Sequence, residues 1–250
     1  MSSIYRIAAA FMPLLMAMLL SCAKRTENPD VVHVVTDATY RPFEYVNEKR
    51  ELVGYDIDLF RAIGEIAGFE TRFQHQTFDG GLAGLRTGKF DAMISAMTIT
   101  EERQKTFLFS DPYYDAAQVV AVREDETQIN SFEDLEGRNI GAARGTTGYL
   151  KAVEVPKAQV LEYDSIELAF TALQIGSVDA VVNDEPTSRA VAAKRGGFKL
   201  VGGPLTKEQY GIAMMKGSEE LAGRINAALK QLKENGELDR LHQKWIVGGP

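Results

Sequence analysis

An internal echo in the sequence narrows the folds open to this chain. The pattern Leu-x-x-Gly-x-x-Asp-Ala occurs at residues 85–92 and again at residues 173–180, 88 residues later. In both copies an apolar helical pattern precedes the glycine, and an apolar strand pattern follows the aspartate. The echo predicts two α/β lobes of similar construction. A common helix–turn–strand idiom that arose twice would leave the same trace.

Strand and helix patterns alternate along the rest of the chain, which favours an α/β architecture. A hydrophobic fraction of 45% is that of a globular protein with a core. Because ligands of open α/β sheets bind beyond the carboxyl ends of strands, the two echo strands predict a shared cleft. Strands are expected over 31–36, 90–96, 118–123, 139–143 and 180–183, and helices over 54–68, 165–175, 219–234 and 237–245.

The N-terminus carries export features. Arg6 is the only charge before an apolar run over 7–20 that is short for a bilayer span. The following Leu-Leu-Ser-Cys, ending at Cys22, resembles the bacterial lipobox, in which the cysteine is lipidated and becomes residue one. We predict a signal peptide over 1–21 and a lipidated tether over 22–30. A plain signal peptide or a membrane anchor is the alternative.

Several classes of function are disfavoured by composition and motifs. The net charge is −7 with no run of Lys or Arg, which argues against a nucleic-acid partner. His33, His75 and His242 are far apart, and Cys22 is the only cysteine, so no metal site is expected. Neither a P-loop nor a GxSxG motif is present, and no cofactor is expected.

The segment SAMTITEER, residues 95–103, is the strongest candidate for ligand binding. Thr98, the N–H groups of a helix start and Arg103 could converge on one small anion. A guanidinium binds a carboxylate with two hydrogen bonds, and helix-start amides add further donors. The alternative is a strand, a capped turn and a solvated arginine.

Two further segments carry candidate polar groups. The stretch GAARGTTG, residues 141–148, lacks the GxGxxG spacing, but Thr146 and Thr147 offer hydroxyls and N–H groups to a small anion. These threonines could instead cap the next helix. Asp184 ends the second echo strand and could pair with an ammonium group. It could equally be the N-cap of the helix that follows.

Aromatic candidates lie near the first strand and at a helix entry. Within DATYRPFEY, residues 37–45, Tyr40 could stack on a ligand, and Asp37 could hold a distal positive or amide group. Phe78 could be a second stacking wall. The alternative for these residues is an ordinary loop with core aromatics.

Together these segments resemble the family of extracellular solute-binding proteins of amino-acid ABC importers. The resemblance covers residues 31–245, and the order and spacing of its pieces make it specific. The matching pieces are DATYRPFEY (37–45), LVGYDIDL (52–59), LRTGKFDAMIS (85–95), TITEER (98–103), FSDPYY (109–114), DLEGRNIGAARGTTG (134–148), GSVDAVVND (176–184), YGIAM (210–214) and KW (244–245).

The resemblance implies an α/β fold of two lobes, the type II periplasmic binding protein fold, with a central sheet flanked by helices in each lobe. Two crossings join the lobes, and the ligand is enclosed between them. Carried onto this chain, lobe 1 comprises residues 31–114 plus 213–250, and lobe 2 comprises residues 118–208.

The resemblance also assigns roles to polar groups. Arg103 matches the arginine that clamps the ligand α-carboxylate, with help from the amides of Thr98 and Thr147. Asp184 matches the acid that takes the α-ammonium, beside the Ser95 carbonyl and the Thr98 hydroxyl. The pair suits a zwitterion, which needs one cation and one anion held a few ångströms apart.

Side-chain recognition is less sharply implied. Tyr40 and Phe78 match the aromatics that sandwich the ligand side chain, and Asp37 matches an acid used for basic or amide groups. Ala96 replaces a serine seen in some members, and Gly148 replaces a glutamine seen in some binders of basic residues. These two departures blur the side-chain preference.

The predicted protein is a monomeric, lipid-anchored receptor on the periplasmic or extracytoplasmic face of a membrane. It captures arginine, lysine, histidine or glutamine by lobe closure and delivers the L-amino acid to an ABC permease. An enzyme similar to cyclohexadienyl dehydratase, with Glu44 or Glu185 as its acid, is the first alternative to this non-enzymatic function. A sensory receptor domain is the second.

Overall fold

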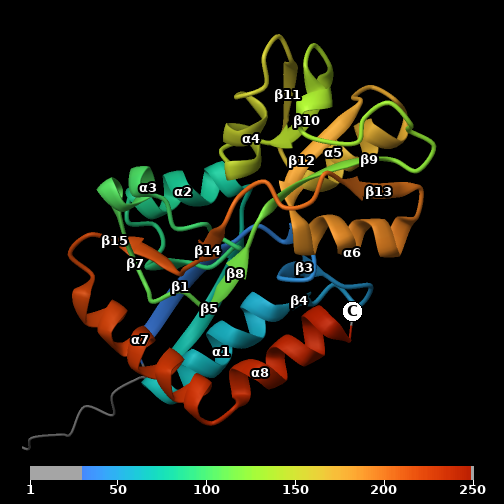
Figure 1. The fold of residues 1–250 in the computed structure, drawn as a ribbon. Coiled ribbons are helices and arrows are strands. Elements are labelled where there is room, and N and C mark those ends of the chain that lie inside the picture. The colour runs from blue at the N-terminus through green and yellow to red at the C-terminus, as the bar shows by residue number, and fades with distance from the viewer. Residues whose placement is uncertain (1–29, 249–250) are drawn as a thin grey trace, which may run out of the picture.

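The computed structural model describes residues 30–248, which form two lobes joined by a narrow link (Figure 1). The predicted signal peptide, the lipidation site Cys22 and the tether up to residue 29 lie outside the described residues. Across 30–248, none of the helices has both the length and the apolar character needed to cross a membrane.

The first sheet, with its helices, is called lobe 1. Its strands have the order β5-β1-β6-β15-β7, in which β1 is parallel to β5 and β6, and β15 is antiparallel to β6 and β7. The strands are β1 (Asp30–Thr36), β5 (Phe69–His75), β6 (Ala92–Met93), β7 (Phe107–Phe109) and β15 (Ala213–Met215). The helices are α1 (Tyr55–Ala67), α2 (Phe78–Arg86), α3 (Glu101–Thr106), α7 (Glu219–Glu234) and α8 (Glu237–His242), which continues as a π-helical turn over Gln243–Val247.

The second sheet, with its helices, is called lobe 2, and it repeats the plan of the first. Its order is β11-β10-β12-β9-β13, with β10 parallel to β11 and β12, and β9 antiparallel to β12 and β13. The strands are β9 (Gln118–Arg123), β10 (Asn139–Ala143), β11 (Gln159–Tyr163), β12 (Ala180–Asp184) and β13 (Phe198–Val201). The helices are α4 (Thr147–Ala152), α5 (Ile166–Gln174) and α6 (Glu185–Arg195), with a 3₁₀ turn at Glu133–Leu135.

The sequence echo corresponds to α2–β6 in lobe 1 and α5–β12 in lobe 2. In both copies the aspartate side chain accepts a hydrogen bond from a backbone N–H of a neighbouring strand. The Asp91 carboxylate accepts a hydrogen bond of 2.8 Å from the His33 N–H, and Asp179 accepts one of 2.9 Å from the Asn139 N–H. Both acceptors join the start of the echo strand to its parallel neighbour, β1 in lobe 1 and β10 in lobe 2. The glycine of each copy has a left-handed φ, of 70° and 76°.

The lobes are linked by two antiparallel strands, β8 (Tyr114–Ala116) and β14 (Glu208–Tyr210). In Figure 1 this ribbon lies between the two sheets, and each strand carries the chain across once. A small sheet of β2 (Thr39–Tyr40), β3 (Glu44–Val46) and β4 (Leu52–Val53) lies on the lobe 1 side. So few linking residues permit the lobes to move relative to one another.

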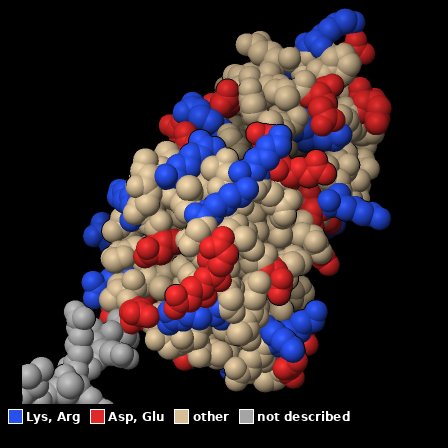
Figure 2. All heavy atoms as spheres, turned by 90° about the vertical axis from the view of Figure 1, so that its left-hand side faces the viewer, with Lys and Arg blue, Asp and Glu red and all other residues tan. Residues whose placement is uncertain are grey.

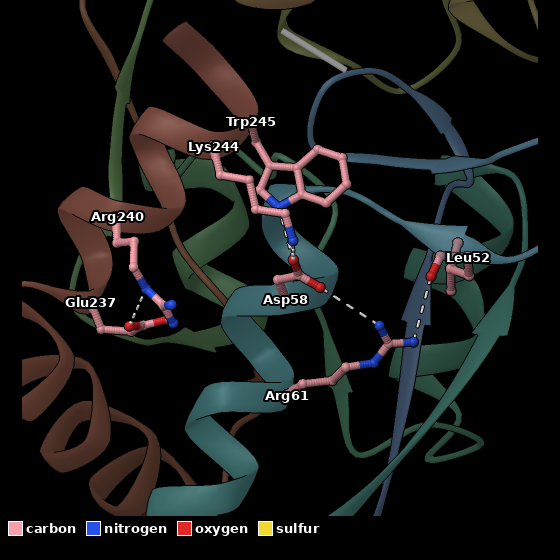
Figure 3. A network of polar contacts seen from close by, with 7 residues as sticks. All are labelled: Leu52, Asp58, Arg61, Glu237, Arg240, Lys244 and Trp245. Carbon is pink, nitrogen blue, oxygen red and sulfur yellow. Dashed lines mark hydrogen bonds and ion pairs between the residues drawn. The ribbon is translucent and has the colours of Figure 1, made fainter. Parts of the chain in front are cut away.

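The last helical segment is anchored to α1 by the Asp58 carboxylate (Figure 3). This carboxylate accepts hydrogen bonds from Lys244 Nζ at 2.7 Å and from the Trp245 indole N–H at 2.9 Å. Arg61 lies on its other side, 3.6 Å away, and also reaches the Leu52 carbonyl. The bonds fix the C-terminal helix against lobe 1.

The surface is mixed in charge. On the face shown in Figure 2, basic and acidic residues are interspersed, and neither sign gathers into one large patch. Many of the ion pairs are short-range and exposed, such as Lys105 with Glu102 and Arg240 with Glu237. Exposed pairs of this kind contribute little to stability, so the fold depends on its apolar cores.

Candidate functional site

One pocket between the lobes is lined by every residue that the sequence singled out for ligand binding. These are Asp37, Tyr40, Phe78, Ser95, Ala96, Thr98, Arg103, Thr146, Thr147 and Asp184. Lobe 1 supplies seven of them and lobe 2 supplies three, from segments at the carboxyl ends of strands. Ala143 and Ile166 also line the pocket, and sequence reasoning missed them because both read as core residues.

Arg103 lies where the two lobes meet. The helix that carries it is capped by the Thr100 hydroxyl, which accepts a hydrogen bond from the Arg103 N–H at 3.1 Å. Its guanidinium donates to the Thr98 carbonyl of lobe 1 at 2.7 Å and to the Gly145 carbonyl of lobe 2 at 3.1 Å. It also lies 5.1 Å from the centre of the Phe78 ring. Burial lowers its pKa to about 10, so it is still a cation at neutral pH.

Asp184 lines the same pocket from lobe 2, and its charge acts to raise the pKa of Arg103. It occupies the N-cap position of α6, yet in the described structure its side chain makes no capping hydrogen bond. Instead its two oxygens accept hydrogen bonds from the hydroxyls of Tyr40 and, at 2.7 Å, Tyr210. Burial first, and then the charge of Glu208, raises its pKa to about 6. Asp184 therefore belongs to the pocket rather than to the helix start.

The loop after β1 is fixed by its own polar contacts. Asp37 accepts a hydrogen bond from the Thr39 hydroxyl at 2.8 Å, and burial raises its pKa. The Asp37 N–H donates to Ser95 Oγ at 3.0 Å, and Ser95 in turn donates to Glu44 at 2.8 Å. Ser95 thus joins the pocket wall to a buried acid behind it.

Glu44 and Asp56 form a buried acidic pair behind the pocket. Asp56 accepts hydrogen bonds from the Ala96 N–H at 2.7 Å and the Tyr113 hydroxyl at 2.9 Å, and Ala96 has a left-handed φ of 41°. Burial raises the pKa of Asp56 to about 6, and burial together with the Asp56 charge raises the pKa of Glu44 well above its ordinary value. Among the described residues, Glu44 Oε2 and Asp56 Oδ1 have no hydrogen-bond partner. A proton held by the pair lets one carboxyl group donate to the other, in keeping with the raised pKa of both.

This pair makes stability depend on pH in an unusual direction. Asp56 has an ordinary pKa of 3.8 and a folded pKa of about 6, so the folded state binds the proton more tightly. The stabilisation is present below about pH 4 and is lost as the pH rises to about 6, roughly 3 kcal/mol for this group. In urea unfolding between pH 4 and pH 6.5, the wild type should lose about 2 kcal/mol more stability than Asp56→Asn, because part of the effect is already lost at pH 4.

A matched control separates this effect from general charge. Glu65 is exposed on the same helix, α1, so Glu65→Gln should follow the wild-type pH profile. Parallel profiles for Asp56→Asn and the wild type would contradict the role given to the buried pair.

The glycine-rich segment lines the pocket and also caps the helix that follows it. Thr146 is the N-cap of α4: its hydroxyl accepts from the Tyr149 N–H at 3.3 Å and donates to the Ala143 carbonyl at 2.7 Å. Thr147 is the first helical residue, where an N–H group has no partner within its own helix. A Cβ on Gly148 would lie 2.6 Å from the Val182 carbonyl oxygen, so the site requires glycine.

Sequence reasoning missed several polar residues around the pocket. Glu208 and Tyr210 lie on the link strand β14, and Gln118 opens β9. Glu208 stands two residues before Tyr210 in the YGIAM piece, and Asp56 lies inside the LVGYDIDL piece. The available signal in the sequence was an acidic residue inside or next to a segment that matches the family, as Asp56 and Glu208 do.

The acids named for the enzyme alternative do not line the pocket. Glu44 is fully buried beneath Ser95, and Glu185 pairs with Arg189 on α6 at 2.6 Å. Among residues 30–248, no three His, Cys, Asp or Glu side chains are grouped so as to hold a metal ion. What the pocket offers is a cation and an anion from separate lobes, aromatic walls and hydroxyl groups.

The model of the bacterial extracellular solute-binding proteins, family 3, matches residues 32–248. The glutamine-binding protein GlnH of an ABC transporter from Bacillus subtilis (strain 168) is 38% identical over 80% of this chain and 75% of its own length. The arginine-binding periplasmic protein of Mannheimia haemolytica is 33% identical over 94% of this chain and 98% of its own.

Solved structures agree with this match. An ancestral arginine-binding protein bound to arginine superposes with a TM-score of 0.84 at 39% identity. The alignment covers 86% of this chain and 98% of that protein. Similarity therefore extends over both lobes and the link between them.

Proposed function

This chain belongs to the bacterial extracellular solute-binding proteins of family 3, and on that basis we propose that it captures a free polar or basic L-amino acid. The observation that carries the proposal is that Arg103 and Asp184, which belong to different lobes, line one pocket. An amino acid carries a carboxylate and an ammonium on one carbon, and these two side chains match that pair of charges.

The α-carboxylate is bound by Arg103 in this proposal. Its guanidinium has five N–H groups, and two of its nitrogens contact backbone carbonyls, so further donors are free for a ligand. The amides of Thr98 and Thr147 add donors from both lobes. Asp184 takes the ammonium, because a carboxylate has about four acceptor positions and two tyrosine hydroxyls use only part of them.

The ligand side chain extends between Tyr40 and Phe78 toward Asp37. An acid at the distal end favours a cationic or amide side chain, which gives the order arginine, lysine, histidine and glutamine. The names of the relatives support this range, since one is an arginine-binding protein and another a glutamine-binding protein.

In this proposal the lobes close around the amino acid, and the closed protein delivers it to an ABC permease. We place lobe 1 at residues 31–114 plus 213–250 and lobe 2 at residues 118–208, with motion at the two link strands. In this proposal a lipid on Cys22 holds a monomer at the periplasmic or extracytoplasmic face, and the chain is not an enzyme.

A thermal-shift screen of the L-amino acids tests the proposal. At 100 times Kd, a ligand adds about 2.7 kcal/mol of stability, which raises Tm by roughly 5–10 °C in a protein of this size. Shifts are expected with one or a few of the polar or basic amino acids, and D-arginine serves as the stereochemical control. A flat screen across all L-amino acids would overturn the proposal.

A further inference from the structure

Glu208 is the first residue of the link strand β14, and its carboxylate reaches the wall of the pocket. One of its oxygens accepts hydrogen bonds from the hydroxyls of Thr98 at 2.7 Å and Thr147 at 3.0 Å. The same oxygen lies 3.2 Å from the Gln118 side-chain amide, and the other accepts from the Thr206 hydroxyl at 3.0 Å.

These donors come from different parts of the molecule. Thr98 belongs to lobe 1, whereas Thr147 and Gln118 belong to lobe 2. The hydroxyls of Thr98 and Thr147 are themselves 3.3 Å apart across the cleft. One carboxylate oxygen on the link therefore ties both lobes together at a point where both threonines line the pocket.

We propose that Glu208 is an interlobe latch: it positions Thr98 and Thr147 in the closed conformation and so sets how long an amino acid stays bound. Every contact uses the chain's own atoms, so the latch stabilises closure with or without an amino acid in the cleft. Because Glu208 bonds to both lobes, opening must break its hydrogen bonds to at least one of them.

Two effects of the Glu208 charge oppose each other. As an ionised acceptor it makes strong hydrogen bonds to both lobes, which favours closure. As an anion it repels an incoming ligand carboxylate. The same charge also acts on the Arg103 guanidinium, where it raises the pKa. The first effect is the larger, so removing the carboxylate weakens binding instead of strengthening it.

The latch acts mainly on release. A ligand that is held by closure dissociates after the lobes open, and a weaker closed state opens more often. Association begins with the open conformation, in which Glu208 does not bond to both lobes. Loss of the carboxylate should therefore raise koff and Kd, with a smaller rise in kon because the ligand-free protein is open for more of the time.

The test compares Glu208→Ala and Glu208→Gln with the wild type, with L-arginine as the probe. Titration calorimetry gives Kd, and stopped-flow displacement gives koff. For Glu208→Ala, koff and Kd should both rise at least about 10-fold, with kon within about threefold. Glu208→Gln retains an acceptor oxygen and should show a smaller rise of the same sign. It also keeps the test valid if the alanine variant folds poorly.

Gln209→Ala is the matched control, because Gln209 is the next residue of the strand. Its side-chain amide donates to Asp115 of the other link strand, β8, and not to a pocket residue. This variant should leave koff unchanged. Unchanged or tighter L-arginine binding in both Glu208 variants would overturn the latch.

The affinity readout rests on the proposed function, so a second measurement does not use an amino acid. Small-angle scattering without ligand should show a larger radius of gyration for Glu208→Ala than for the wild type, and equal profiles would overturn the latch. If the wild type fails to bind any amino acid while the profiles differ, the proposed function fails and the latch stands.

Discussion

Arg103→Ala is expected to weaken L-arginine binding at least about 100-fold. The guanidinium is the cation on its side of the pocket, and each hydrogen bond to a charged partner is worth roughly 1.5–3 kcal/mol. Two such bonds to a carboxylate correspond to a factor of 100 or more. Titration calorimetry with L-arginine measures the loss directly.

Two companion variants sharpen this result. Arg103→Lys keeps the charge but loses the planar fork, so it should recover only part of the affinity. Lys105→Ala removes a cation from the exposed side of the same helix, α3, and should bind as the wild type does. Binding by Arg103→Ala within threefold of the wild type would remove Arg103 from the proposed site.

Gly54→Ala is expected to cost the fold at least about 2 kcal/mol. Gly54 precedes α1 with φ of 138°, and an added Cβ would lie 2.0 Å from the Phe43 carbonyl oxygen. That oxygen already accepts a hydrogen bond from the Asp56 N–H at 2.9 Å, so it cannot simply move aside. Backbone strain and overpacking each cost about 1–3 kcal/mol. Urea unfolding at pH 7 measures the sum.

Gly68→Ala provides the control at the other end of α1. Gly68 also has a positive φ, of 76°, but an added Cβ there would meet no atom within 4 Å. Its cost should be the left-handed strain alone, about 1–2 kcal/mol. Equal losses in the two variants would show that the collision with Phe43 is relieved at no cost.

Local patterns in the sequence predicted much of the fold. The strand expected over 31–36 is β1, which begins one residue earlier, at Asp30. The helix expected between Gly54 and Gly68 is α1, and the two glycines are its caps. The expected strand at 118–123 is β9. These elements are governed by apolar spacing and glycine punctuation, which are properties of neighbouring residues.

Other elements depend on contacts that the sequence does not display. The strand expected over 90–96 is paired only at Ala92–Met93, because the chain turns at Ala96 to place its N–H on Asp56. The helix expected over 237–245 changes to a π-helical turn at Gln243, where Trp245 reaches Asp58. Both departures follow from partners that are distant in the chain.

The pocket shows the same division. Its ten candidate residues were predicted from local motifs and from the family resemblance, and all line one pocket. Glu208 was missed because its partners Thr98 and Thr147 are 110 and 61 residues away in the chain. The pairing of Glu44 with Asp56 was equally hidden, since an acid in a polar loop reads as solvated until burial is known.

The strand order of lobe 1 has a consequence for biogenesis. Strand β15, residues 213–215, lies between β6 and β7, although it follows the whole of lobe 2 in the chain. The strands of lobe 2 are continuous in the chain, so this lobe can reach its native pairing while the ribosome still holds the C-terminus. Lobe 1 must wait with a gap in its sheet. A nascent chain stopped before residue 213 would therefore expose two unpaired strand edges, which is the stage at which aggregation and proteolysis threaten it most.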